Sequence, residues 1–227
     1  MPIFKSVNKK FFKKWSHNMA YVLGFFAADG NMIKNRRGAH FLSLEITDLD
    51  ILLKIKKTLG SSHKISSRPE TEHWKTRYRF QIGSKEMYED LLCLGITPNK
   101  SKIIQFPSKI PAQYLSDYIR GYFDGDGCVH LGRYWRKDRA RWKWQFATRF
   151  TSGSKDFLGG LWRVLRPYVR GGFIVKKKGG YELVFAAKDS LALSNFIYNN
   201  GTASLFLERK FRKFQQARKT LQTAGVV

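Results

Sequence analysis

The feature that most constrains the fold of this 227-residue chain is a ten-residue segment that occurs twice. Residues 21–30 read YVLGFFAADG and residues 118–127 read YIRGYFDGDG, with Tyr, Gly, Phe, Asp and Gly at matching positions. Other segments recur in the same order, since residues 40–47 resemble 144–151 and residues 78–86 resemble 181–189. Because the similarity runs through most of the chain, the sequence predicts two homologous halves.

Prolines mark the boundary between the halves. Pro107 and Pro111 enclose a short segment, which reads as a linker. We therefore expect an N-terminal repeat over residues 1–106, a linker over 107–111 and a C-terminal repeat over 112–227. Each repeat reads as helix, two strands, helix, two strands and helix, which is an αββαββα unit of the α+β class.

The repeated segments have the signals of two helices that end at an acid. Ser16 is a candidate N-cap for the first helix, which is expected to end at Asp29. Pro111 opens the second, which is expected to end at Asp126. Gly24 and Gly121 fall inside these helices, where glycine costs about 1 kcal/mol relative to alanine, so we expect close helix contact at both positions.

Two such helices packed about a local dyad would bring their terminal acids together. The C-terminus of a helix already carries partial negative charge, and two carboxylates there would attract a divalent cation. Mg²⁺ prefers carboxylate and backbone oxygens completed by water and phosphate. The predicted metal ligands are the two acids and the residues before them: Asp29, Asp126, Ala28 and Gly125.

The charge of the chain predicts a polyanionic partner. Lys and Arg number 42 and Asp and Glu 17, giving a net charge of +25, while a hydrophobic content of 43% is enough for a folded core. Two expected strands alternate apolar residues with long polar donors, as in nucleic-acid-facing sheets. The predicted DNA-binding residues are Arg68, Lys75, Arg77, Arg79, Gln81, Arg139, Arg141, Lys143, Gln145 and Arg149.

Other compartments and site types are disfavoured by the sequence. No run approaches the roughly 18 apolar residues of a membrane span. The basic N-terminus lacks a secretory apolar core, and with only two cysteines a zinc site or disulfide scaffold is not expected. We expect a protein of the cytoplasm or an organellar matrix that is not secreted and does not bind membranes.

The paired motifs resemble the LAGLIDADG homing endonucleases in their monomeric, two-motif form, and residues 119–127 match particularly well. This resemblance implies two pseudo-symmetric repeats packed through their motif helices, with antiparallel sheets forming a DNA-binding saddle. It also implies that Asp29 and Asp126 bind the catalytic Mg²⁺, that Mn²⁺ can substitute, and that Ca²⁺ binds without supporting cleavage.

The same resemblance suggests further catalytic residues. Lys100 and Lys210 match the basic residue near each active centre, with Lys102 and Arg209 as rivals. Asp48, with Ser152 as its weaker counterpart, matches a water-positioning residue.

The expected function is Mg²⁺-dependent double-strand cleavage of DNA at a long, loosely palindromic site. We expect an intron-encoded, free-standing monomer, since the sequence shows no protein-splicing block around the repeats. One alternative is a maturase that acts on intron RNA. Another is a DNA-binding regulator that does not cut, which is favoured by Ala27 standing where the second motif has Asp124.

Overall fold

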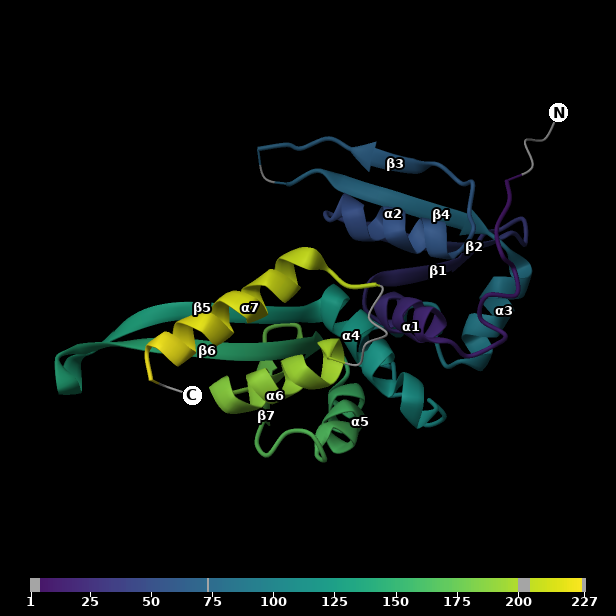
Figure 1. Ribbon diagram of the computed structural model, residues 1–227. Coiled ribbons are helices and arrows are strands. Elements are labelled where there is room, and N and C mark those ends of the chain that lie inside the picture. Colours follow the sequence, from purple (N-terminus) through teal and green to yellow (C-terminus); the bar gives the residue numbers. More distant parts are fainter. Residues whose placement is uncertain (1–4, 73, 200–204, 226–227) are drawn as a thin grey trace. The chain divides into compact units, whose positions relative to one another are not determined.

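The computed structural model describes residues 5–72, 74–199 and 205–225, which form two compact units (Figure 1). Unit 1 comprises the residues up to Lys100 together with Pro107–Gly125, and unit 2 comprises Ser101–Phe106 and the residues from Asp126 onward. The second motif helix thus packs with unit 1, while its last residue begins unit 2. Among the described helices, none is both long enough and apolar enough to cross a membrane.

Unit 1 follows the predicted αββαββα order and adds the second motif helix. Its strands form an antiparallel sheet in the order β1-β2-β4-β3. The elements are α1 (His17–Asp29), β1 (Gly30–Lys34), β2 (His40–Ile46), α2 (Leu49–Thr58), β3 (Ile65–Arg68), β4 (Arg77–Gly83), α3 (Lys85–Cys93) and α4 (Leu115–Asp126).

The sheet of unit 1 has one apolar and one polar face. Leu44 of β2 stands opposite Phe80 of β4 and both are buried, against α2 and α3. Burying side chains of this size contributes roughly 1.5–3 kcal/mol each. The alternate positions carry polar groups, since Glu45 stands opposite Arg79 and Ser43 opposite Gln81. Strand alternation therefore directs the long polar donors away from the core.

The two motif helices pack closely in unit 1, at the glycines. A Cβ added to Gly24 of α1 would lie 2.0 Å from the carbonyl oxygen of Tyr118 in α4. One added to Gly121 would lie 2.0 Å from the carbonyl oxygen of Tyr21. Neither position has room for a larger residue, so the cost of glycine in each helix is offset by this backbone contact.

A buried polar network crosses the same helix pair. Arg120, with 1% of its surface exposed, pairs with Asp117, which also contacts the His17 ring at 2.7 Å. The Tyr21 hydroxyl donates to Asp124 at 2.8 Å, and both groups are buried. Buried charges are tolerated only when they are paired in this way, so the network specifies how the two helices meet.

Unit 2 also follows the αββαββα order, counting α4 as its first helix, and its antiparallel sheet has the order β5-β6-β8-β7. Its helices α5 and α6 and the final helix α7 pack on the sheet, and α7 runs alongside β5 (Figure 1). The elements are β5 (Gly127–Arg136), β6 (Arg141–Ser152), α5 (Lys155–Leu165), β7 (Phe173–Lys177), β8 (Gly180–Phe185), α6 (Ala187–Tyr198) and α7 (Glu208–Thr223).

Two features differ from the sequence prediction. Helix α7 is an addition to the αββαββα order, and it buries Phe214, Ala217 and Leu221 at helical spacing. The polar strands also start later than expected. Backbone hydrogen bonds between Thr71 and Trp74 form a turn before β4, and a 3-10 turn over Lys137–Arg139 precedes β6. Lys75 and Arg139 therefore lie in connections, not in strands.

We predict that Gly24→Ala lowers the free energy of unfolding by about 1–3 kcal/mol or more, because the new methyl group would collide with the Tyr118 carbonyl. Urea unfolding measures the change. Gly159→Ala in α5 is the matched control, since its Cβ would meet nothing within 4 Å. It should stabilise the protein by roughly 0.5–1 kcal/mol. Equal stability of Gly24→Ala and the wild type would contradict the close helix contact.

Candidate functional site

Asp29 is the last residue of α1, where the helix passes directly into β1. The amide of Gly30 donates to the carbonyl of Phe26, and a Cβ at position 30 would lie 2.3 Å from the Phe26 ring. Glycine is therefore needed immediately after the acid. The Asp29 side chain is half-buried at the negative end of the helix dipole, which adds to the attraction for a cation.

Lys100 contacts the backbone on both sides of Asp29. Its Nζ donates to the carbonyl oxygen of Ala28 at 3.2 Å and to that of Gly30 at 2.6 Å. The side chain is 7% exposed and lies in a 3-10 turn over Lys100–Lys102, whereas its rival Lys102 is exposed. The geometry therefore places Lys100, and not Lys102, at the end of the first motif helix.

The last turn of α4 packs against the same group of residues. A Cβ added to Gly125 would lie 2.4 Å from the Cβ of Ala28 and 3.0 Å from Oδ2 of Asp29. Unit 1 thus brings together Ala28, Asp29, Lys100 and Gly125 from the two predicted active-centre motifs and the lysine that follows.

Asp126 and Lys210 belong to unit 2. Asp126 ends α4 and is half-buried, and the next residue, Gly127, begins β5, which repeats the helix-to-strand junction of Asp29. Lys210 lies in the first turn of α7 and is 4% exposed, whereas its rival Arg209 is exposed. In each half, therefore, the lysine that the family resemblance implies is the buried one of its pair.

The oxygen atoms at the end of α1 suit a hard divalent cation. The Asp29 carboxylate is an oxygen ligand of the kind that Mg²⁺ prefers, and the Ala28 carbonyl keeps a second lone pair beside the one that accepts from Lys100; such sites are completed by water and phosphate. Within the parts of the chain that the structure describes, no group of three or more His, Cys, Asp or Glu side chains could hold a metal. A protein-only cage is thus not formed there, whereas a site of few carboxylates fits the donors present.

The predicted water-positioning residues differ in their surroundings. Asp48 is half-buried at the N-cap of α2, and its carboxylate makes no capping bond to that helix. Ser152 ends β6 and is buried, and its hydroxyl accepts a hydrogen bond from the Ser154 amide at 3.1 Å. Ser152 therefore has a local structural role in the turn before α5.

The polar face of the unit 1 sheet collects the donors that the sequence predicted. Arg77 and Arg79 of β4 are exposed and Gln81 is half-buried. Arg68 of β3 stands directly opposite Arg77. Glu45 lies next to this row, with its carboxylate 3.9 Å from the Arg68 guanidinium. The result is a strand surface rich in hydrogen-bond donors and positive charge.

Unit 2 presents a comparable surface on a longer strand pair. Arg141, Lys143 and Gln145 of β6 are exposed, and Arg149 is half-buried. Sequence reasoning missed two residues of β5, since Tyr134 stands opposite Lys143 and Arg136 opposite Arg141 on the same face. Residues 130–136 (HLGRYWR) do not alternate cleanly between apolar and polar side chains, so this strand lacks the local signal that β4 and β6 carry. The pKa of Arg136 is raised because Asp138 accepts a hydrogen bond from its guanidinium.

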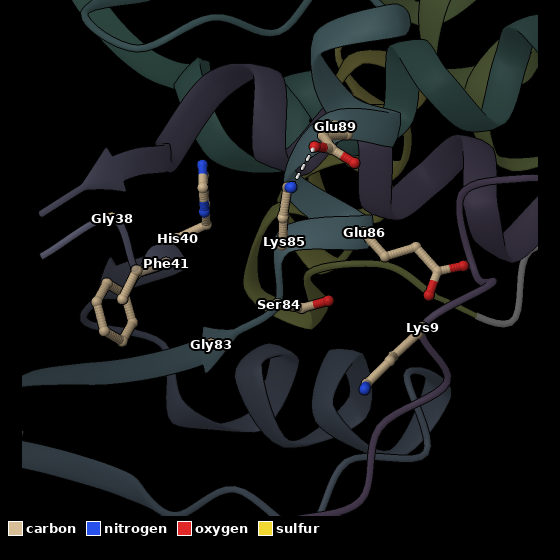
Figure 2. Close-up of a pocket in the computed structure, with 10 residues that line it drawn as sticks. Lys9, Gly38, His40, Phe41, Gly83, Ser84, Lys85, Glu86 and Glu89 are labelled. Atoms are coloured by element: carbon tan, nitrogen blue, oxygen red, sulfur yellow. Dashed lines mark ion pairs between the residues drawn. The ribbon is translucent and has the colours of Figure 1, made fainter.

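A separate hollow of about 690 Å³ lies where β2 begins and β4 ends (Figure 2). Its charges are mixed, because Lys9 and Lys85 share it with Glu86 and Glu89. Lys85 lies 3.7 Å from Glu89, the ion pair drawn in Figure 2. This balanced surface is less suited to a polyanion than the strand faces are.

Comparison with known proteins identifies the fold. A sequence model of the LAGLIDADG-like domain matches residues 16–93. The chain is 27% identical over 151 residues to the DNA-directed RNA polymerase subunit Rpo1C of Methanocaldococcus jannaschii, a match that covers 65% of this chain and 15% of that protein. It is 22% identical over 178 residues to elongation factor 2 of Methanopyrus kandleri, covering 77% of this chain and 12% of that one. The chain thus spans a small part of these relatives.

Two solved structures extend the similarity to nearly the whole chain. The LAGLIDADG meganuclease I-AabMI bound to uncleaved DNA superposes with a TM-score of 0.65 at 13% identity, covering 90% of each chain. The I-LtrWI LAGLIDADG homing endonuclease bound to target DNA gives 0.62 at 14% identity, covering 96% of this chain and 92% of that one. Residues 16–93 therefore match the LAGLIDADG-like domain, and the chain as a whole has the fold of the LAGLIDADG homing endonucleases.

Proposed function

We propose that this protein is a site-specific endonuclease that cleaves both strands of DNA at a long, loosely palindromic site with Mg²⁺. The observation that carries the proposal is the repeated end of the motif helix, where a half-buried acid is followed by glycine. A buried lysine accompanies each acid in the sequence, Lys100 after Asp29 and Lys210 after Asp126. The DNA-bound endonucleases with the same fold support the assignment.

The chain's own residues have separable roles in this reaction. Each half would hold a divalent metal through its own motif acid, Asp29 or Asp126, with the carbonyl of the residue before it, Ala28 or Gly125. When bound, the metal stabilises charge on the phosphate oxygens and lowers the pKa of a coordinated water. Lys100 fixes the carbonyls on either side of Asp29, so the position of that acid is set before substrate arrives. Asp48 is proposed to orient the attacking water.

Affinity and sequence choice would come from different parts of the surface. The net charge of +25 favours phosphate contacts, which give binding that falls steeply with salt and carries no sequence information. Exposed donors on the two strand faces can reach base edges, where arginine prefers guanine and glutamine prefers adenine. Because the two faces carry different residues, the preferred site should be only loosely palindromic.

The matches to segments of other proteins indicate the kind of genetic element that encodes this protein. The matches cover small parts of a polymerase subunit and of an elongation factor, which indicates that similar segments occur within unrelated proteins. We propose that the protein belongs to a mobile element, in an intron or within a longer reading frame. A monomer suffices for a double-strand break, because each half supplies one acid.

Replacing both acids should abolish cleavage and spare binding. We predict that Asp29→Asn/Asp126→Asn yields no cut ends from a random duplex library with Mg²⁺, while sequencing after wild-type digestion reveals one long site. The amides keep the shape but remove the negative charge that holds the metal. A wild type that enriches a long site without cutting it would contradict the endonuclease and favour the regulator. Binding to intron RNA alone would favour the maturase.

Lys100→Met should impair both stability and cleavage. The change leaves the Ala28 and Gly30 carbonyls without their buried donor, which costs about 1–3 kcal/mol of unfolding free energy. Cleavage rates should fall by at least about tenfold as Asp29 loses its fixed position. Denaturant unfolding and single-turnover cleavage measure the two effects. Lys102→Met, at an exposed position, should stay within about 0.5 kcal/mol of the wild type.

Arg79→Ala should relax sequence preference at one base pair. Its exposed guanidinium lies in the middle of β4, where a bidentate contact to guanine is worth about 1–3 kcal/mol. A binding-site profile from selected duplexes measures the change. Arg163→Ala, exposed on α5, is the matched control and should leave the profile unchanged. Uniform weakening at every position would show that Arg79 contacts phosphate only.

A further inference from the structure

Trp74 is an exposed aromatic residue whose backbone is held in place. It lies in the connection between β3 and β4, and 64% of its surface is exposed. Its amide donates to the Thr71 carbonyl at 3.2 Å, and the Thr71 amide donates to the Trp74 carbonyl at 2.9 Å. Indoles are mostly buried in folded proteins, so one displayed on a hydrogen-bonded turn calls for a contact outside the unit.

Cations surround this indole. A hollow of about 240 Å³ is lined by Trp74 with Arg68, Lys75 and Arg77, together with Pro69 and Thr71. The Arg77 guanidinium lies 5.6 Å from the centroid of the Trp74 ring, a cation–π arrangement that orients its donors. Glu70 and Glu72 belong to the same connection but do not line the hollow. Three cationic side chains and one aromatic ring therefore line the hollow.

The register of the strands adds to this positive charge. Arg68 stands directly opposite Arg77, and like charges at opposed positions destabilise a strand pair. Glu45 offsets Arg68 only weakly, at 3.9 Å between partly exposed groups. An anion seated between the two guanidinium groups would remove the repulsion, so the arrangement suits a bound phosphate.

We propose that these four residues, Arg68, Trp74, Lys75 and Arg77, form a backbone clamp for DNA. The cations would bind a phosphodiester group, and the indole would pack on the adjacent deoxyribose. The inference rests on the proposed function and deepens it. It assigns Arg68, Lys75 and Arg77 to phosphate contact and leaves Arg79 and Gln81, farther along β4, to read bases.

Backbone contact fits the chemistry of the clamp better than base reading does. Arg68 and Arg77 stand opposite each other beside an indole, and two guanidinium groups at one place suit an anionic phosphate, whereas a guanine is read by a single bidentate arginine. The faces of paired bases are stacked and closed to an indole, but the sugar edge presents apolar surface. Trp74 thus fixes where the strand lies, which in turn fixes the base pairs that Arg79 and Gln81 reach.

Salt-dependent binding to a fluorescein-labelled duplex of 30 base pairs and mixed sequence tests the clamp. Arg77→Ala should reduce the slope of log affinity against log salt by about 0.9, the value for one lost phosphate contact. Trp74→Ala should weaken binding about five- to tenfold at every salt concentration with the slope unchanged, because the change removes apolar contact with the sugar but no charge. Trp74→Phe should retain most of the affinity. Leu53→Ala, exposed on α2, is the surface control and should bind as the wild type does.

Other outcomes would overturn the inference in distinguishable ways. If Trp74→Ala binds as the wild type does, or if Arg77→Ala keeps the full slope, the clamp does not contact DNA. If Trp74→Ala changes preference at a single base pair without general weakening, the indole reads a base. If the wild type itself neither binds nor cuts duplex DNA, the proposed function fails together with the clamp. Thermal melting of each variant separates these results from loss of the fold.

Discussion

The contact between the two motif helices is the constraint on which the proposed active centre depends. Gly24 and Gly121 allow the backbones of α1 and α4 to touch, each against a carbonyl of the partner helix. This approach carries the last turn of α4 to Ala28 and Asp29. A larger residue at either glycine would separate the helices by more than the tolerance of a metal site, which is well under an ångström. The site therefore requires glycine at both positions, although glycine lowers the stability of each helix.

The charge of the protein creates a second constraint, because acids must hold a divalent cation within a strongly basic chain. In the structure, the positive charges near Asp29 are either directed to backbone carbonyls or exposed to solvent. The lysine nearest Asp29 is buried, and its ammonium is directed to the backbone carbonyls of Ala28 and Gly30. Most other lysines and arginines are exposed. Screening by water and salt weakens the exposed positive charges, whereas the Asp29 carboxylate and the helix end act at short range, and the positive charge of the buried Lys100 is partly neutralised by the two carbonyls that accept its hydrogen bonds.

Much of this organisation could be predicted from sequence, and the exceptions have physical causes. The repeated ten-residue segment predicted two homologous halves, and the structure confirms the αββαββα order of elements in each. Helix α7 was missed because its first two turns carry Arg209, Lys210, Arg212 and Lys213, and these charges obscure the apolar spacing of its buried residues. The start of β4 was missed because the turn closed by Thr71 and Trp74 has no Gly or Pro signal. The burial that separates Lys100 from Lys102 is a tertiary property and cannot be read from local pattern.

The packing of α1 against α4 explains why the first motif has Ala27 where the second has Asp124. Asp124 accepts a hydrogen bond from Tyr21 and is almost completely buried, so it contributes to the packing of α1 against α4. Its counterpart Ala27 lies on the other helix and is also buried, where a small apolar side chain needs no partner. A carboxylate there would have to find donors in the same crowded interface. The missing acid therefore bears on how the helices pack, and by itself it is no argument against a first active centre at Asp29.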